Sequence, residues 1–373
     1  MNTRSLFRNL HLIFGLVVGL VVSAVGISGS ILTFREEIEH WLYSPAIGNV
    51  YPAVMPKWQM TYEQVLTMSD VGKRRVSVIV LPQGHTTAGE FITSLRGARS
   101  LKEADQISVY VTPTGEIIGQ RHRNASFIAW LRDLHFALFA GTIGLKVNGW
   151  FALGLIFISL TGFVLWLQTY VKGKAFAVNL KASWKRQLWD WHRLLGIVML
   201  LFLLLVAATG AYYPFRETVQ KWFVSAGTAL PPRGTPQITP PPNAKPLTID
   251  EIIAKARPVL PEATLAVVRP PASPTQAWAA TFHRRFDSGE STDGGPTAYL
   301  DPFTGAMLRL DDTRAMPFGA RLLKNIEPLH FGKYAGLPNK LLWFLLGITP
   351  TFFFISGITL WWNRTRGARK KSS

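Results

Sequence analysis

The chain of 373 residues contains no cysteine. Disulfide bonds, cysteine-ligated iron–sulfur clusters and thiolate nucleophiles are therefore excluded. Acidic residues are also scarce, with 22 Asp and Glu against 40 Lys and Arg, and the formal net charge is +18. The sequence shows no Ser-His-Asp grouping, no pair of catalytic carboxylates and no glycine-rich phosphate loop. These absences argue against the commoner acid–base, nucleophilic and nucleotide-dependent enzymes.

Apolar residues are abundant, at 48% of the chain, and they gather in four long runs. About 20 helical residues span a hydrocarbon core of ~30 Å. The runs therefore predict transmembrane helices over residues 10–34, 149–170, 191–215 and 341–362. The first run follows Arg4 and Arg8, as the core of a signal peptide does, but it is too long for such a core and its pattern recurs in the third run. We expect it to be an uncleaved helix.

Basic residues are concentrated in the short segments that flank these runs, at residues 1–9, 171–190 and 363–373. The positive-inside rule assigns such segments, and with them both termini, to the cytoplasm. The two long connections then lie outside, in the periplasm of a bacterial inner-membrane protein. They comprise residues 35–130 and 216–323, the second with a stiff proline-rich leader at 231–246. The charge thus indicates orientation in a lipid bilayer, and nucleic-acid binding is not expected.

The sequence also repeats itself. The segment HLIFG at residues 11–15 matches HRLLG at 192–196, and LHF at 134–136 matches LHF at 329–331. Glycines follow at matching offsets in both blocks, namely Gly29 with Gly210 and Gly162 with Gly357. Duplication of this kind builds membrane proteins with a pseudo-two-fold axis, which brings equivalent residues face to face. We therefore expect two histidine pairs, His11 with His192 and His135 with His330.

Helix geometry keeps the two pairs apart. A helix of about 24 residues, from His11 to Arg35, spans ~36 Å at 1.5 Å per residue, so His11 and His135 cannot share one metal ion. We expect His11 and His192 near the inner face of the membrane. His135 and His330 are predicted to lie near the outer face, on interfacial segments at residues 131–148 and 324–340.

A pair of histidines suits haem iron better than a bare metal ion. Transition metals usually take three or four protein ligands, and no carboxylate or sulfur ligand recurs beside these histidines. Haem iron needs only two axial ligands, and a bis-histidine haem transfers electrons because it is coordinatively closed. We predict haem b at both pairs, two per chain, with a single haem on one pair as the alternative. Arg35 and Arg216 are candidate partners of the haem propionates, or else ordinary interfacial cations.

The other four histidines follow no clear repeat. His40 is predicted to be exposed at a helix end. His85, His122 and His283 are expected to be solvated residues of the outer segments. Arginines flank His122 and His283, so contact with an anionic substrate is an alternative for these two.

Each outer segment is predicted to be a small α+β domain. In the second, residues 247–253 predict a short helix with Thr248 as N-cap and Glu251 three residues on. Strand-like runs follow at 264–268 and 277–282, and residues 298–308 predict a hairpin around a Pro/Gly turn. The first segment offers a helix near residues 60–65 and a similar hairpin at 108–118.

The hairpins read VTPTGEI at residues 111–117 and LDPFTGAM at residues 300–307, both close to the type V-x-P-x-T-G-x-I, and helices that begin His-x-x-x-Gly flank the segments that carry them. Over nearly its whole length the chain therefore resembles the PepSY-associated transmembrane family. The resemblance implies an integral membrane α-helical protein with four transmembrane helices, internal duplication and two periplasmic α+β PepSY-like domains. Some members are inner-membrane reductases of ferric siderophores, and the lack of an appended flavin domain resembles that branch.

The expected function is thus a di-haem electron-transfer protein that reduces a periplasmic ferric siderophore and releases ferrous iron. Its electron donor is expected to be a separate cytoplasmic reductase or a membrane quinol. One alternative is a membrane-anchored PepSY regulator or inhibitor of a protease, without redox activity. Another keeps the haems but passes the electrons to a periplasmic redox protein.

Overall fold

The computed structural model describes residues 3–47, 57–68, 74–82, 89–95, 106–112, 115–170, 176–284, 295–334 and 336–372. The chain folds into two compact units. The first, which we call the helical unit, comprises Met1–Phe34, Leu131–Trp222 and Leu329–Ser373. The second, the sheet unit, comprises Arg35–Trp130 and Phe223–Pro328. Each unit is therefore assembled from separate stretches of the chain.

Long apolar helices dominate the helical unit. Three of them are long and apolar enough to cross a membrane: α1 (Thr3–Thr33), α5 (Gly141–Tyr170) and the Gly336–Arg366 part of α10 (Gly336–Ser372). A fourth span is possible if α6 (Trp184–Val198) and α7 (Leu200–Ser225) are taken together, across a bend of 61°. These helices identify a membrane protein. Two shorter helices, α4 (Phe127–Ala137) and α9 (Phe318–Phe331), precede α5 and α10.

Residues 191–215, predicted as one transmembrane span, are divided between α6 and α7, which meet at a bend of 61°. The position of the bend at Met199 follows from composition, because α6 is amphipathic and carries Asp190 and Arg193, whereas the stretch that follows is almost wholly apolar. Charged residues are costly in the hydrocarbon core, so the two stretches suit different surroundings. Within α7, Pro214 precedes a non-helical Phe215, as expected where proline removes a helix hydrogen bond.

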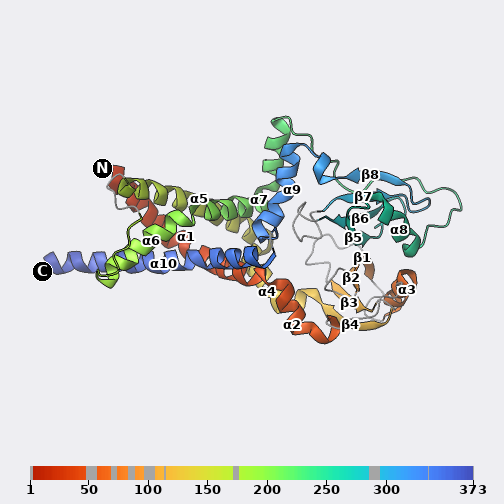
Figure 1. Cartoon of the computed structure of the whole chain (residues 1–373), viewed down its shortest axis with the longest axis horizontal. Coiled ribbons are helices and arrows are strands. Elements are labelled where there is room, and N and C mark those ends of the chain that lie inside the picture. The colour runs from red at the N-terminus through yellow and green to blue at the C-terminus, as the bar shows by residue number, and fades with distance from the viewer. Residues whose placement is uncertain are drawn as a thin grey trace. The chain divides into compact units, whose positions relative to one another are not determined.

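Small residues let α1 and α10 approach closely, and Figure 1 shows these helices, red and blue, side by side. Gly26 lies against the backbone oxygen of Gly347, where any side chain at position 26 would clash. Ser30 donates a hydrogen bond of 2.8 Å to the carbonyl oxygen of Phe344. Such contacts stabilise helix pairs in lipid, where apolar burial gives no advantage over contact with lipid tails.

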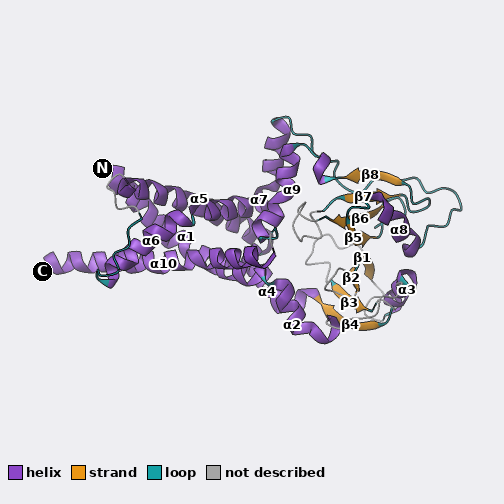
Figure 2. Ribbon diagram, in the orientation of Figure 1, coloured by secondary structure: helices purple, strands orange, loops and turns teal. Residues whose placement is uncertain are grey.

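The sheet unit is built on eight antiparallel strands in the order β4-β3-β2-β1-β5-β6-β7-β8, drawn in orange in Figure 2. The first half supplies β1 (Arg74–Val80), β2 (Gly89–Leu95), β3 (Ile107–Val111) and β4 (Ile117–His122). The second supplies β5 (Thr264–Arg269), β6 (Trp278–His283), β7 (Thr297–Leu300) and β8 (Met307–Asp311). Each half places its fourth strand at an outer edge and its first strand at the centre of the sheet.

Helices accompany the strands in both halves. Helix α3 (Trp58–Thr67) precedes β1, and α8 (Ile249–Ala256) precedes β5. The predicted cap of α8 is confirmed, because Thr248 Oγ1 accepts from the amide of Glu251 and the Glu251 carboxylate accepts from the amide of Thr248. The remaining elements are α2 (Arg35–Ile47) and the 3₁₀ turns η1 (Arg123–Ala125), η2 (Arg257–Val259) and η3 (Thr313–Ala315). Both predicted hairpins are present, as β3–β4 and β7–β8.

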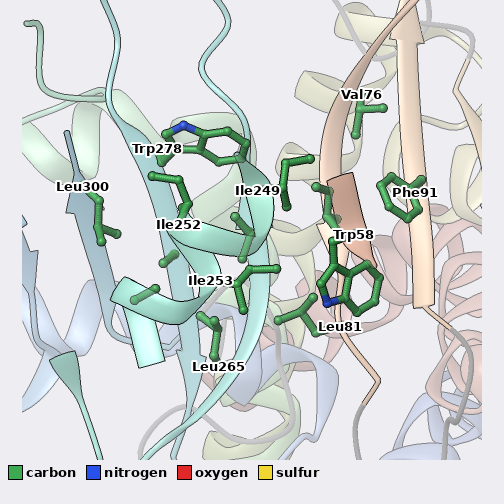
Figure 3. Close-up of a cluster of buried hydrophobic side chains, with 14 of the residues drawn as sticks. Trp58, Val76, Leu81, Phe91, Ile249, Ile252, Ile253, Leu265, Trp278 and Leu300 are labelled. Carbon is green, nitrogen blue, oxygen red and sulfur yellow. The ribbon is translucent and has the colours of Figure 1, made fainter. Parts of the chain in front are cut away.

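The two halves share one sheet and one core, although the sequence indicated two separate outer domains. Strands β1 and β5 pair directly, with Ile79 opposite Val268 and Val80 opposite Val267. Figure 3 shows buried side chains of both halves in a single cluster, among them Trp58, Phe91 and Ile252. A repeat in the sequence predicts two copies of a motif, but the pairing of their first strands has no local sequence pattern to mark it.

The helices α3 and α8 also cap each other across the two halves. The carboxylate of Asp250 accepts hydrogen bonds of 3.0 Å from the backbone amides of Trp58 and Gln59, at the start of α3. In return, Gln59 Oε1 accepts from the amide of Ile249, at the start of α8. These amides would otherwise lack partners within their own helices. The mutual caps therefore fix the two halves relative to each other.

Candidate functional site

The helical unit brings four histidines together as two pairs. His11 of α1 and His192 of α6 have ring centroids 6.3 Å apart, with an angle of 81° between the rings. His135 of α4 and His330 of α9 have centroids 6.1 Å apart, with an angle of 48°. The members of each pair are far apart in sequence, and they are the partners that the internal repeat predicts.

The first pair is held through its Nδ1 atoms. Nδ1 of His11 lies 3.1 Å from the carbonyl oxygen of Ile158 and 3.1 Å from Thr161 Oγ1, both on α5. Nδ1 of His192 lies 2.6 Å from Ser356 Oγ on α10. Each ring is thus oriented by the last long helix of its own repeat, α5 for His11 and α10 for His192.

The second pair is held in the same way. Nδ1 of His135 lies 2.7 Å from the carbonyl oxygen of Val25 and 3.3 Å from Ser28 Oγ, both on α1. Nδ1 of His330 lies 2.9 Å from Thr209 Oγ1 on α7. All four imidazoles therefore share one arrangement, in which a neighbouring helix supplies a hydroxyl, with a carbonyl added at His11, His135 and His330, the last from Val206.

These contacts favour one assignment of the proton on each ring. A carbonyl oxygen can only accept, so Nδ1 of His11 and of His135 must donate. The Ser356 hydroxyl donates to the carbonyl oxygen of Phe352, and Thr209 Oγ1 donates to that of Leu205. Their lone pairs are left to accept from Nδ1 of His192 and His330. In all four neutral rings Nε2 is therefore the atom with a free lone pair.

This arrangement is the one that a metal-binding histidine requires. Such a histidine donates its second N–H to a fixed acceptor, which sets the tautomer and the orientation of the ring. With nitrogen–metal bonds of about 2.0 Å, as at zinc sites, two imidazoles on opposite sides of one ion have centroids about 6.3 Å apart. Ordinary aromatic pairs also lie at 4.5–7 Å, so the spacing alone decides little. The spacing together with four uniform Nδ1 contacts distinguishes these pairs from simple packing.

Each pair offers two nitrogen ligands, and among the described residues it has no third protein ligand. In the part of the chain that the structure describes, no group of three or more His, Cys, Asp or Glu side chains is placed to hold a metal ion. A closed tetrahedral zinc site needs four ligands. Haem iron needs two, because the macrocycle supplies the others. The donor set therefore fits haem.

The two pairs are well separated along α1. The His135 ring contacts Val25, Ser28 and Gly29 of this helix, which lie 14 to 18 residues beyond His11 in the sequence. At 1.5 Å per residue the separation is about 21–27 Å. One ion cannot contact both pairs, so the unit contains two distinct sites near opposite ends of one helix.

A cavity of about 450 Å³ lies at the first pair. Such a volume is typical of pockets for small ligands and cofactors. Its lining is largely apolar and includes His11, His192, Phe353 and five glycines, Gly15, Gly19, Gly162, Gly196 and Gly357. A Cβ atom added at Gly15, Gly196 or Gly357 would meet no atom within 4 Å. These glycines therefore border open space, as a site for a flat macrocycle requires.

Other glycines allow the imidazoles to approach their helices. A Cβ atom at Gly29 would lie 2.6 Å from Cε1 of His135, and one at Gly162 would lie 3.0 Å from Cε1 of His11. At Gly210 the corresponding distance, to Cε1 of His330, is 3.1 Å. The repeated glycines thus have a packing role beside three of the four histidines.

The hydroxyl partners were not singled out in the sequence analysis. Thr161 and Ser356 are equivalent in the repeat, as are Ser28 and Thr209, and each immediately precedes one of the repeated glycines. A Ser/Thr-Gly dipeptide at the offset of each histidine was the available pattern. Serine and threonine are common in membrane helices, so this pattern is evident only once the histidine pairs have been recognised.

The other residues that the sequence suggested are not members of the two histidine pairs. Arg35 begins α2, where it lies 3.6 Å from Glu36, and Arg216 is an exposed residue of α7. The carboxylate of Asp190, two residues before His192, pairs with Arg186 and Arg193. His85 lies outside the described residues, as does the side chain of His40. His122 ends β4 and His283 ends β6, both in the sheet unit.

Comparison with protein families gives one match. The model of the PepSY-associated TM region matches residues 8–364, nearly the whole chain. A search of the curated proteins returned no match. The match covers both units and all four paired histidines. The chain therefore belongs to this family.

Proposed function

We propose that this member of the PepSY-associated transmembrane family is an electron-transfer protein of the bacterial inner membrane. It holds haem b at His11–His192 and at His135–His330, and it reduces a ferric siderophore on the periplasmic side. The observation that supports this proposal is the hydrogen bonding that the four imidazole rings share. Each has its Nδ1 bound to a neighbouring helix, which leaves Nε2 able to ligate iron.

Haem with two axial histidines supplies a reversible one-electron carrier that has no open position for dioxygen. The chain's own contribution is to fix the ligands and their distance. The helices hold each imidazole in one tautomer, and the inner cavity presents a largely apolar lining to the first pair. Separation of the pairs along α1 provides two electron positions, one toward each side of the membrane.

Reduction of the siderophore needs no acid, base or nucleophile from the protein. Ferric iron in such a complex is held by hard oxygen ligands. One electron converts it to the ferrous ion, which these ligands hold less tightly, and the siderophore is released unchanged. Electrons come from a separate donor, either a cytoplasmic reductase or a membrane quinol. The predicted orientation, with basic segments inside, places His11 and His192 on the donor side.

The test is an absorption spectrum of the full-length protein purified in detergent, oxidised and then reduced, with haem quantified per chain. We expect two low-spin haems b per chain and reoxidation by a ferric siderophore. His11→Ala and His135→Ala should each remove one haem and abolish reoxidation. A wild-type protein without haem after expression with adequate haem supply would refute the proposal. It would favour the alternative of a PepSY regulator without redox activity.

A second comparison separates the siderophore from a protein acceptor. Reoxidation of the reduced protein is followed with a ferric siderophore and, separately, with an oxidised periplasmic redox protein. The proposal expects the siderophore to be the faster acceptor. Reoxidation by the redox protein alone would leave the haem assignment intact and overturn the assignment of the substrate.

A further inference from the structure

The cavity at the first histidine pair has a basic border. Arg8 of α1, Arg193 of α6 and Arg364 of α10 all line it. Arg8 and Arg364 are exposed, as expected of cations that orient a protein at a membrane surface. Arg193 is different, because only 5% of its side chain is exposed. A buried guanidinium needs another explanation.

Asp190 balances the charge of Arg193, but the hydrogen-bonding groups of Arg193 are only partly used. Arg193 pairs with Asp190 at 3.2 Å and donates to the carbonyl oxygen of Ala177. The same carboxylate also pairs with Arg186 at 3.2 Å. One buried carboxylate thus serves two guanidinium groups. Arg186 is half-exposed to solvent, and Arg193 also packs on the ring of Trp189, 4.5 Å from its centroid. Any further group that Arg193 binds would be an anion or a hydrogen-bond acceptor.

Two of the nitrogen atoms of Arg193 indicate where such a group would bind. Nε and Nη1 are buried and have no hydrogen-bond partner among the described residues. The indole Nε1 of Trp166, which lines the same cavity, is likewise buried and without such a partner. Buried N–H groups are nearly always hydrogen-bonded in native proteins. The unmet donors of both residues call for a ligand with acceptor oxygens.

The internal repeat does not account for the two arginines. The histidines, glycines and hydroxyls of the site recur in both halves, but Leu12 stands at the position equivalent to Arg193 and Thr169 at that equivalent to Arg364. Both arginines therefore depart from the duplicated pattern. A role in packing the repeated helices would not require them in one copy only.

We propose that Arg193, with the indole N–H of Trp166 as a second donor, binds a carboxylate group at the edge of the cofactor held by His11 and His192. The inference rests on the proposed function and adds a recognition site to it. Guanidinium groups bind carboxylates in a two-pronged geometry that few other side chains match. Arg193 thereby selects a macrocycle with free carboxylates and fixes its orientation in the cavity.

The test compares haem with haem dimethyl ester, in which both carboxylates are blocked. The parent protein is full-length His135→Ala, so that only the first pair takes up the cofactor. Each compound is titrated into the haem-free protein in detergent, and the dissociation constants are measured by absorption. Hydrogen bonds to charged groups contribute about 1.5–3 kcal/mol. The parent should therefore bind haem roughly 10- to 150-fold more tightly than the ester.

Arg193→Gln should reduce this preference to within about threefold, chiefly by weakening haem binding, and Arg193→Lys should retain part of it. The matched control is Arg186→Gln, which removes the other cation bound to Asp190 but does not line the cavity, and it should keep the parent's preference. An unchanged preference in Arg193→Gln would overturn the proposal. Loss of ester binding as well would assign Arg193 to folding and also overturn it. A parent that binds neither compound would instead refute the proposed function at this pair.

Discussion

Ser356 gives the sharpest test of how the histidines are held. Within the described part of the chain, its hydroxyl is the one hydrogen-bond partner of His192 Nδ1, at 2.6 Å. His11, the other member of the pair, has two partners, the carbonyl oxygen of Ile158 and the hydroxyl of Thr161. Removal of equivalent hydroxyls should therefore have unequal effects. Ser356→Ala leaves a buried N–H without an acceptor, whereas Thr161→Val leaves His11 its carbonyl.

The expected size follows from the cost of an unsatisfied buried donor, about 1–3 kcal/mol. In Ser356→Ala that cost falls on the ligating tautomer of His192, so haem at the first pair should bind about 5- to 150-fold more weakly. Loss of an outer-shell partner of a metal ligand typically lowers metal affinity by about 10- to 100-fold, which lies within this range. For Thr161→Val we expect a change of less than about fivefold.

The assay is the transfer of haem from the full-length protein to an excess of a soluble haem-binding apoprotein. It is run in the His135→Ala background, so that only the first pair is observed. We expect the His135→Ala parent and its Thr161→Val variant to lose haem at similar rates, and the Ser356→Ala variant to lose it much faster. If Thr161→Val and Ser356→Ala lost haem equally, the carbonyl would not hold His11, and our assignment of the tautomers would be wrong.

Three further predictions concern the second pair and the sheet unit. Gly29→Ala places a Cβ 2.6 Å from Cε1 of His135, so we expect it to lower the haem content measured at the second pair. Asp250→Ala removes the cap of α3 and should destabilise the sheet unit by about 0.5–2 kcal/mol in chemical unfolding. Burial acts to raise the pKa of Asp312, but hydrogen bonds from Arg284 and a backbone amide outweigh it and hold the pKa below its ordinary value of 3.8. A carboxylate of this kind stabilises the fold above that value and loses its contribution as the pH falls through the folded-state pKa. Asp312→Asn should therefore lower stability by about 1 kcal/mol at neutral pH, and thermal unfolding should show the difference shrinking below about pH 4.

Local patterns in the sequence were sufficient for much of the fold. The capping box at Thr248 and both hairpins depend on residues a few positions apart, and the structure contains them. The bend at Met199 was not predicted, because residues 191–215 were treated as one apolar run although Arg193 lies within it. The junction of β1 with β5 could not be predicted, since strand pairing over such a distance depends on tertiary packing that no short motif records.

The candidate site was predictable to the extent that it repeats. His11 and His135 have counterparts in His192 and His330 at matching positions of the repeat. The pairs could therefore be predicted from pseudo-symmetry without any distance. Arg193 and Trp166 were missed as donors for a different reason. Their significance lies in unmet hydrogen bonds inside a cavity, and a sequence cannot show which of its many arginines and tryptophans are buried without a partner.

The choice of neutral partners for the imidazoles has a consequence for the proposed electron transfer. The Nδ1 partners found for all four rings are hydroxyls and carbonyls, although Asp190 is only two residues from His192. A carboxylate partner raises the basicity of a ligating histidine, and a more basic ligand stabilises ferric iron more than ferrous iron. An ionised carboxylate is also costly within a membrane unless it is paired. Asp190 meets that condition through its arginines. Haem held by neutral partners should therefore have a higher reduction potential than haem held through carboxylates, which eases the entry of electrons from a weakly reducing donor such as a quinol.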